Sequence, residues 1–109
     1  MDFKTYQEKS RKTAVYPDAG ENVVYPTLGL VGEAGEVANK VKKILRDKGG
    51  VVSEEARAQI TDELGDVLWY IAQLATELRC NLADIAESNI EKLYSRMDRG
   101  VLQGSGDKR

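Results

Sequence analysis

The sequence contains no histidine and only one cysteine, Cys80, and both features restrict the chemistry open to this chain. Without imidazole, a serine–histidine–aspartate triad, a cysteine–histidine pair and a histidine metal site cannot form within one chain. A single thiol excludes intrachain disulfides and clusters of several thiolates around zinc, and it is typical of a protein from the reducing cytoplasm. Catalysis would therefore have to use carboxylates, amines, hydroxyls or a recruited metal ion.

Long hydrophobic runs and an excess of one charge are also missing. No apolar run approaches the ~20 residues that a membrane span needs, and residues 1–6 lack the pattern of a signal peptide. Sixteen Lys and Arg against eighteen Asp and Glu leave a net charge of −2. This balance argues against nucleic-acid binding through net charge, so we predict neither a nucleic-acid nor a membrane partner.

Helical periodicity is the dominant local signal in the 109 residues. We predict helices from Asp2 to Ala14, from Pro26 to Gly49, from an N-cap at Ser53 onward, and from Asn81 to Gly100. The apolar stripes of the two long helices are Leu30, Ala34, Val37, Val41 and Ile44, and Ile60, Leu64, Val67, Ile71, Leu74 and Leu78. This rhythm predicts an all-α fold, an antiparallel bundle of about four helices. Residues 1–100 form one domain in this interpretation, and 101–109 form a flexible tail.

The third predicted helix is apolar on more than one face. Trp69 lies opposite the stripe that contains Ile60 and Val67. One layer of helices covers two apolar faces poorly, whereas a second copy of the chain would cover them better. We therefore predict a homo-oligomer, with a homodimer as the simplest form.

An eight-residue phrase occurs twice, at 30–37 and again at 60–67. Two acids stand at matching positions of the copies: Glu33 and Glu36 in the first, Glu63 and Asp66 in the second. At about 100° per residue, the first acid lies about 60° to one side of its apolar stripe and the second about 120° round in the same direction. Consecutive helices joined by a short turn pack antiparallel, so all four carboxylates are predicted to converge on one place.

The glycines beside the acids, and the repulsion between the acids, both indicate that something binds where the carboxylates converge. Glycine inside a helix costs about 1 kcal/mol relative to alanine, so Gly35 and Gly65 predict close approach by another helix or a ligand. Facing carboxylates repel one another unless cations lie between them. Ligand sets made only of oxygen favour Mg²⁺, with Mn²⁺ as a substitute, and Mg²⁺ directs attention to phosphate esters and anhydrides. The alternative interpretation is four solvated surface acids.

The last predicted helix presents an amide and two cations on one face. Asn89, Lys92 and Arg96 fall within about 60° of one another, so they can grip a polyphosphate. The alternative is a solvated basic face near a helix C-terminus, where cations are favoured in any case. Lys40 and Lys43 follow Glu36 on the acidic shoulder and either meet the outer phosphates or, more simply, remain surface lysines.

Three tyrosines are candidates for contact with a nucleoside. Tyr70 lies one turn past Asp66, where it either packs against a sugar or base or closes the rim of the core. Tyr16 and Tyr25 precede the second helix and are candidates for stacking on a base.

Two segments together resemble a known family. Residues 32–37 and 63–70 are similar to the EExxE…ExxD pattern of MazG-like nucleotide pyrophosphohydrolases of the all-α NTP pyrophosphatase superfamily, and 89–93 resemble the NxxKL segment of that family. The resemblance covers residues 13–101. It implies Mg²⁺-dependent hydrolysis of a nucleoside triphosphate between the α and β phosphates, to a monophosphate (NMP or dNMP) and pyrophosphate, in nucleotide-pool housekeeping. It also implies dimers or dimers of dimers.

The resemblance implies a ligand set for the metal: Glu33, Glu36, Glu63 and Asp66. Gly32 departs from the pattern, because the family often has two adjacent glutamates there; any role of the first must pass to another carboxylate. Our hypothesis makes Glu33 the general base and has Lys92, with Arg96, neutralise phosphate charge. Asn89 and Tyr70 would position sugar or phosphate. The alternatives are an enzyme like phosphoribosyl-ATP pyrophosphohydrolase and a non-catalytic helical protein-interaction module.

Overall fold

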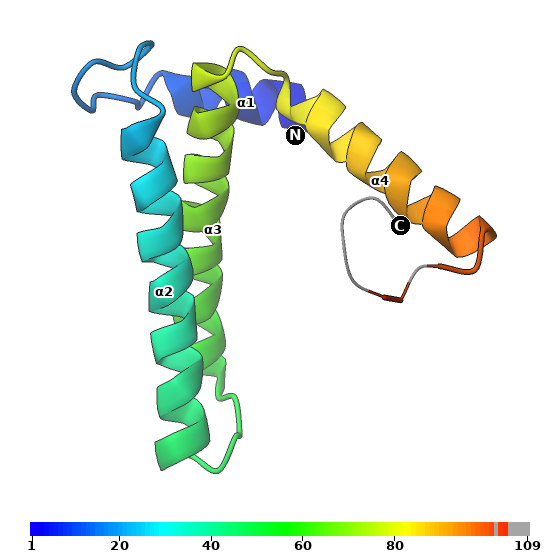
Figure 1. The fold of residues 1–109 in the computed structure, drawn as a ribbon. Helices are drawn as coiled ribbons and strands as arrows, with labels where there is room; N and C mark the ends of the chain where they lie inside the picture. The colour runs from blue at the N-terminus through cyan, green and yellow to red at the C-terminus, as the bar shows by residue number, and fades with distance from the viewer. Residues whose placement is uncertain (102, 105–109) are drawn as a thin grey trace.

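The computed structural model describes residues 1–101 and 103–104, and helices are its only regular secondary structure there (Figure 1). Helix α1 spans Phe3–Arg11, α2 spans Val24–Asp47, α3 spans Glu54–Glu77 and α4 spans Leu82–Asp98. The predicted all-α class with four helices is confirmed. The predicted flexible tail, 101–109, falls mostly outside the described residues. Within the part that is described, none of the helices combines the length and the apolar character that crossing a membrane requires.

Two of the predicted helix starts are confirmed by their capping hydrogen bonds. The carboxylate of Asp2 accepts from the Thr5 backbone N–H at 2.8 Å, and the Ser53 hydroxyl accepts from the Ala56 N–H at 3.1 Å. Each bond satisfies an N–H that has no partner inside the first turn of the helix. Helix α2 begins two residues earlier than predicted, which leaves Pro26 in its first turn.

Helix α4 begins at the predicted place but is capped differently. Asn81 makes no side-chain cap; its amide donates to the Asp84 carboxylate at 3.2 Å instead. The Leu82 N–H donates to the side-chain oxygen of Gln7 at 2.8 Å. A residue of α1 therefore caps α4, a long-range contact that local sequence patterns do not reveal.

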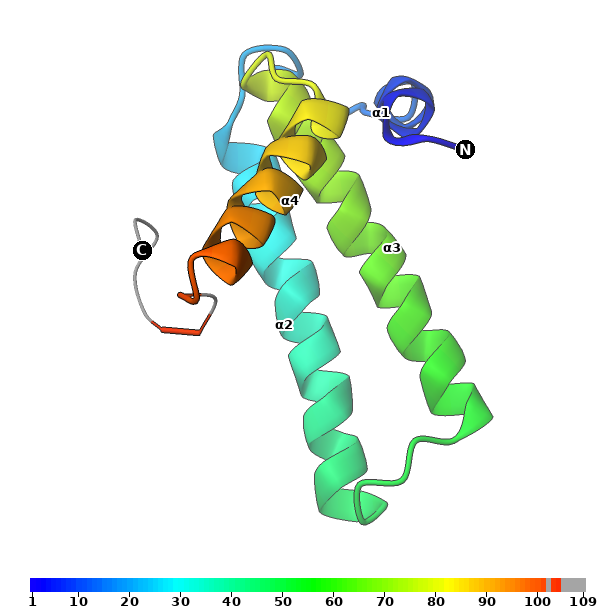
Figure 2. The same ribbon diagram turned by 90° about the vertical axis from the view of Figure 1, so that its right-hand side faces the viewer.

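Helices α2 and α3 form a long antiparallel hairpin. The turn between them contains Gly49 and Gly50, both with positive φ, at 61° and 81°. Helix α1 crosses α3 near the C-terminal end of α3, and α4 departs from the same end (Figures 1 and 2). The buried hydrophobic residues are Tyr16, Ile44, Ala72, Ala75 and Leu82. Most of them lie where α1, the loop after it and α4 meet α3.

Helix α4 does not close a compact bundle within this chain. Among the described residues, α4 packs against α1 and α3 but not against α2. The radius of gyration is 16.8 Å, whereas a compact domain of this length has about 13 Å. The chain alone is thus an open hairpin with one helix across its end and one helix diverging from it.

The seam between α2 and α3 differs from the predicted apolar stripes. Glu33 and Lys40 lie in it beside Val37 and Ile44, whereas Val41, a predicted stripe residue, is exposed. The other stripe residues that the structure leaves exposed are Ala34, Leu64 and Leu78. The physical reason is a rotation of each helix toward its acidic shoulder, which brings acids into the seam and leaves one apolar shoulder uncovered.

Candidate metal centre

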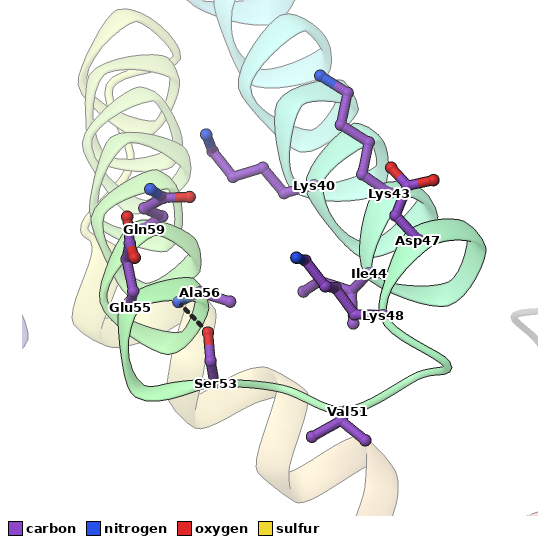
Figure 3. Close-up of a pocket in the computed structure, with 10 residues that line it drawn as sticks. All are labelled: Lys40, Lys43, Ile44, Asp47, Lys48, Val51, Ser53, Glu55, Ala56 and Gln59. Carbon is purple, nitrogen blue, oxygen red and sulfur yellow. Dashed lines mark hydrogen bonds between the residues drawn. The ribbon is translucent and has the colours of Figure 1, made fainter.

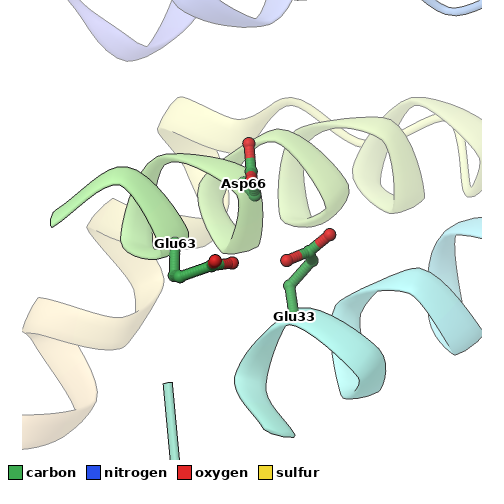
Figure 4. Close-up of side chains that lie close together, drawn as sticks. All are labelled: Glu33, Glu63 and Asp66. Atoms are coloured by element: carbon green, nitrogen blue, oxygen red, sulfur yellow. The ribbon is translucent and has the colours of Figure 1, made fainter. Parts of the chain in front are cut away.

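Three of the four predicted acids meet across the hairpin. Glu33 of α2 faces Glu63 and Asp66 of α3, and one carboxylate oxygen from each lies within 4.8 Å of the other two (Figure 4). Glu33 and Glu63 are half-buried and Asp66 is exposed. We call these three residues the acid cluster. The three carboxylates are close enough to converge on one cation. They offer only oxygen ligands, which are the ligands that hard cations prefer.

Glu36 lies beside the acid cluster rather than in it. Its side chain is exposed, and none of its oxygens belongs to the group within 4.8 Å. Its charge still acts on Glu33, one turn away. The predicted convergence of four carboxylates is therefore seen for three.

The close approach of the three acids raises the pKa of the Glu33 carboxyl. A hydrogen bond with the Glu63 carboxyl is the main cause that raises the pKa of Glu33 above its usual value, and burial adds to it. The charges of Asp66, Glu63 and Glu36 raise that pKa further. Two carboxyls that share a hydrogen bond must share a proton, unless a cation takes its place.

A lysine provides positive charge at the cluster. The Nζ atom of Lys40, on α2, lies 3.8 Å from Oε1 of Glu63. The two side chains are 30% and 19% exposed. Lys40 thus neutralises part of the cluster from within the seam, where the sequence interpretation favoured a plain surface lysine.

Tyr70 lies next to the acid cluster, as predicted, and a glycine makes room for it. A Cβ on Gly29 would lie 2.1 Å from Cε1 of Tyr70, so only glycine fits there with the ring in this place. The ring of Tyr70 also contacts Trp69, with centroids 5.0 Å apart, and Tyr25, at 6.4 Å. Gly29 was not among the predicted residues, because its role depends on the position of Tyr70 on the neighbouring helix. Tyr25 in turn stacks on Tyr16 at 4.8 Å.

The glycines that were predicted to mark a close approach have open space beside them. Neither Gly35 nor Gly65 has an atom within 4 Å of the position a Cβ would take. The predicted approach of another helix is therefore not made within the described part of this chain. Such a contact would have to come from outside the described residues, for example from a ligand or a second copy.

A buried glutamate that sequence analysis overlooked holds the loop before α2. Glu77 accepts hydrogen bonds from the backbone N–H groups of Gly20 and Asn22 and from the side chains of Arg11 and Tyr16. Its side chain is fully buried. The loop that carries Tyr16 is thereby fixed to the end of α3. Nothing in the local pattern distinguishes Glu77 from a surface acid, so only the folded structure reveals this role.

The predicted phosphate-binding face on α4 lies away from the acid cluster. Asn89 and Lys92 are exposed and line a pocket of about 620 Å³ at the start of α4. The acids of the cluster do not line that pocket. Arg96, which was predicted to bind phosphate with them, is buried, with 4% of its surface exposed. The structure therefore brings Asn89 and Lys92 together but not to the acids.

These features define an all-α protein with a carboxylate site suited to a hard cation. Comparison with known proteins then gives the family. The family model of the MazG nucleotide pyrophosphohydrolase domain matches residues 26–101, and the chain belongs to this family. It is also 55% identical over 114 residues to the Gene 37 protein of Mycobacterium phage L5, an alignment that covers all of both chains. No solved structure matches the chain.

Proposed function

We propose that this chain hydrolyses nucleoside triphosphates between the α and β phosphates, releasing a nucleoside monophosphate (NMP or dNMP) and pyrophosphate. The observation that carries the proposal is the acid cluster, whose oxygens lie within 4.8 Å of one another across two helices. Membership of the MazG family supports the reaction class. Removal of unwanted nucleotides is the cellular role in this proposal, and the cytoplasm is its compartment, because Cys80 is a free thiol.

The acid cluster fits a hard divalent cation such as Mg²⁺, with Mn²⁺ as a substitute. It supplies only oxygen ligands, and a cation between the carboxylates would offset the repulsion among their negative charges. Glu33, Glu63 and Asp66 would hold the ion, and Glu36, whose charge acts on Glu33, would be the fourth ligand. When bound, the ion supplies Lewis acidity toward the phosphate and lowers the pKa of a water molecule.

Glu33 is the general base in this proposal. Its carboxylate faces Glu63 and Asp66 across the hairpin, so it would lie beside a water molecule held at the acid cluster, in position to accept the proton of that water. Glu33 takes a proton from the attacking water as the water oxygen bonds to the α-phosphorus. The bond between that phosphorus and the bridging oxygen breaks, and pyrophosphate leaves with the bonding electron pair. Gly32 leaves no adjacent glutamate to share this task.

The predicted phosphate contacts of α4 need a second copy of the chain. Because α4 does not pack against α2 among the described residues, we assign these contacts to a neighbouring subunit in a homodimer or a dimer of dimers. Lys92 of the partner subunit would neutralise phosphate charge, and Asn89 of the partner subunit would position the sugar or phosphate. Tyr70 contacts the sugar or base from within the same chain. Arg96 belongs to this face only if its buried side chain turns outward.

A panel of substrates tests the reaction, with Glu63→Gln as the decisive variant. The eight canonical ribo- and deoxyribonucleoside triphosphates and phosphoribosyl-ATP are incubated with Mg²⁺, and products are separated by ion exchange. We expect pyrophosphate and a monophosphate from at least one of them. Glu63→Gln removes a ligand charge without changing side-chain size, so kcat should fall at least about a hundredfold. Asp62→Asn, an exposed neighbour outside the cluster, is the matched control and should keep full turnover.

Two results would contradict the proposal. Turnover retained in Glu63→Gln would remove the acid cluster from catalysis, and orthophosphate as product would place cleavage at another bond. Calorimetry with Mn²⁺ addresses the non-catalytic alternative, because solvated surface acids give no saturable binding. Cleavage of phosphoribosyl-ATP alone would favour the enzyme of that class.

A further inference from the structure

A second cavity lies along the α2–α3 hairpin, on the side of the acid cluster that leads to the turn. It has a volume of about 570 Å³ and is formed by the C-terminal half of α2, the turn and the start of α3 (Figure 3). The lining includes Lys40, Lys43 and Lys48. Three lysines around one cavity make it positively charged, and none of them has a role in the reaction proposed above.

Lys40 belongs to both the cavity and the acid cluster. Its side chain reaches from α2 toward α3 (Figure 3), and its amine lies 3.8 Å from the Glu63 carboxylate. Gln59, which also lines the cavity, precedes Glu63 by one turn of α3. At 1.5 Å per residue, the cavity therefore begins about 6 Å along the helix from the acid cluster. A bound chain of phosphates would span that separation.

The charge of the cavity suits phosphate groups that extend beyond the acid cluster. Asp47 and Glu55 also line it, but the Asp47 carboxylate is already engaged by Arg46, with contacts of 2.7 Å and 2.8 Å. Lysine amines hold phosphates as compact point charges on flexible stems, so each can change partners by rotation alone. Among the described lining residues, three lysines thus stand against one acid, Glu55, that has no such ion pair. The charge of the cavity is therefore positive overall.

We infer that this cavity receives the pyrophosphate end of the nucleoside triphosphate and that Lys40 moves between two partners. Without substrate, the Lys40 amine neutralises Glu63. With substrate, Glu63 serves the acid cluster and the amine turns to the outer phosphates, beside Lys43. This inference rests on the proposed function and adds the location of the leaving group to it.

Replacing the lysine with a neutral side chain of similar length tests the two partners separately. Lys40→Met should weaken inhibition by inorganic pyrophosphate about tenfold, since a charge-assisted hydrogen bond is lost. The same variant should bind Mn²⁺ about two- to fivefold more tightly in the absence of nucleotide, because a competing cation has left Glu63. Steady-state kinetics measure the first effect and titration calorimetry the second.

Two further variants serve as controls for the weaker pyrophosphate inhibition and the tighter Mn²⁺ binding expected of Lys40→Met. Lys42→Met, an exposed α2 residue outside the cavity lining, should change neither quantity. Lys43→Met should weaken pyrophosphate inhibition without changing Mn²⁺ affinity, because Lys43 lines the cavity, whereas the ion pair with Glu63 belongs to Lys40. Circular dichroism confirms that each variant keeps its helices.

The outcomes separate this inference from the proposed function. If the wild-type protein turns over nucleotides while Lys40→Met and Lys43→Met both match Lys42→Met, the inference is wrong and the proposed function stands. A uniform loss of both Mn²⁺ and pyrophosphate binding in Lys40→Met would make the lysine merely structural and would also overturn the inference. If the wild-type protein neither binds Mn²⁺ nor releases pyrophosphate, both proposals are wrong.

Discussion

Gly29 shows how one missing side chain shapes the neighbourhood of the acid cluster. The Tyr70 ring occupies the space that a Cβ at this position would need. Glycine costs helix stability, and here close packing of an aromatic ring against α2 offsets that cost. The ring then lies within electrostatic reach of Glu33 and Asp66, whose charges add to the effect of burial in raising the pKa of Tyr70.

Gly29→Ala should destabilise the fold although alanine is the better helix former. The added methyl group would lie 2.1 Å from the Tyr70 ring, so the ring or the helix must shift. We expect a net loss of about 1–3 kcal/mol in the free energy of unfolding, typical of overpacking. Urea unfolding followed by circular dichroism measures it.

The matched control for this substitution is Gly65→Ala. Its methyl group would meet no atom within 4 Å, so helix propensity alone should stabilise the protein by up to about 1 kcal/mol. Equal effects of the two substitutions would show that Tyr70 does not pack closely on α2.

Individual residues of the candidate site were predictable to different degrees. The repeat in the sequence placed Glu33, Glu63 and Asp66 correctly on facing helices, because helical periodicity fixes the direction of each side chain relative to its neighbours. Glu36 follows the same periodicity but lies outside the acid cluster, since its final position depends on the rotation of α2. Lys40 and Gly29 owe their roles to residues of α3, which periodicity within α2 cannot reveal.

At the scale of elements, the loop before α2 is tied to α3 through Glu77. Burial by itself raises the pKa of this carboxyl. Hydrogen bonds from the Asn22 N–H, the Tyr16 hydroxyl, the Gly20 N–H and the Arg11 guanidinium outweigh burial and lower the pKa from 4.5 to about 2. The ionised form of Glu77 is therefore more stable, relative to the protonated form, in the folded protein than in the unfolded chain.

This linkage predicts how stability depends on pH. A carboxyl whose pKa is lower in the folded state stabilises the fold above its unfolded value, and that contribution disappears as the pH falls through the folded value. For Glu77 the window runs from about pH 4.5 down to about pH 2. Glu77→Gln should cost on the order of 2–4 kcal/mol at pH 7, because the buried donors lose a charged acceptor.

Urea unfolding at pH 7 and pH 3 tests this dependence. The difference between wild type and Glu77→Gln should shrink by about half or more at pH 3, since the unfolded wild-type chain then gains a proton. Glu8→Gln, an exposed acid on α1, should cost less than about 0.5 kcal/mol at either pH. A pH-independent difference would exclude ionisation of Glu77 as the source.

Helix starts were more predictable than helix faces, whereas the first helix ends at Arg11 and not at Ala14 as predicted. The caps at Asp2 and Ser53 depend on local hydrogen bonds, and the structure contains both. The faces depend on which neighbour each helix meets. The predicted stripes assumed that the most apolar side of each long helix faces the other, but Val41 and Leu64 are exposed. That side of the hairpin has no partner within the described residues of the chain.

At the scale of the whole molecule, the uncovered apolar shoulder points to a second copy. The exposed residues on this shoulder are Val31, Val41 and Leu45 of α2 and Leu64 of α3. Helical periodicity places them about 80–160° around their own helices from Glu33 or Glu63, on the shoulder that the seam leaves uncovered. A radius of gyration of 16.8 Å, against about 13 Å for a compact chain of this length, leaves much of that surface open. The sequence predicted self-association because the third predicted helix is apolar on more than one face. It did not predict the direction of α4, because that direction depends on contacts with α1.

A charge on this shoulder should separate the copies. In Leu64→Lys the lysine replaces a half-exposed leucine, 50% exposed in the single chain, and would be desolvated in a dimer interface without a partner, at a cost of several kcal/mol. Sedimentation velocity should therefore find a dimer or a larger even-numbered assembly for the wild-type protein and a 12.1 kDa monomer for this variant. Ala58→Lys adds the same charge at an exposed position of α3 that lies away from the shoulder, and it should leave the assembly intact.

Because the partner subunit's Lys92 is proposed to complete the site, Leu64→Lys should also raise KM for the nucleotide, and this increase in KM should diminish at protein concentrations that restore the dimer. A wild-type protein that sediments as a monomer at every concentration, yet turns over nucleotides, would show that one chain provides the entire site.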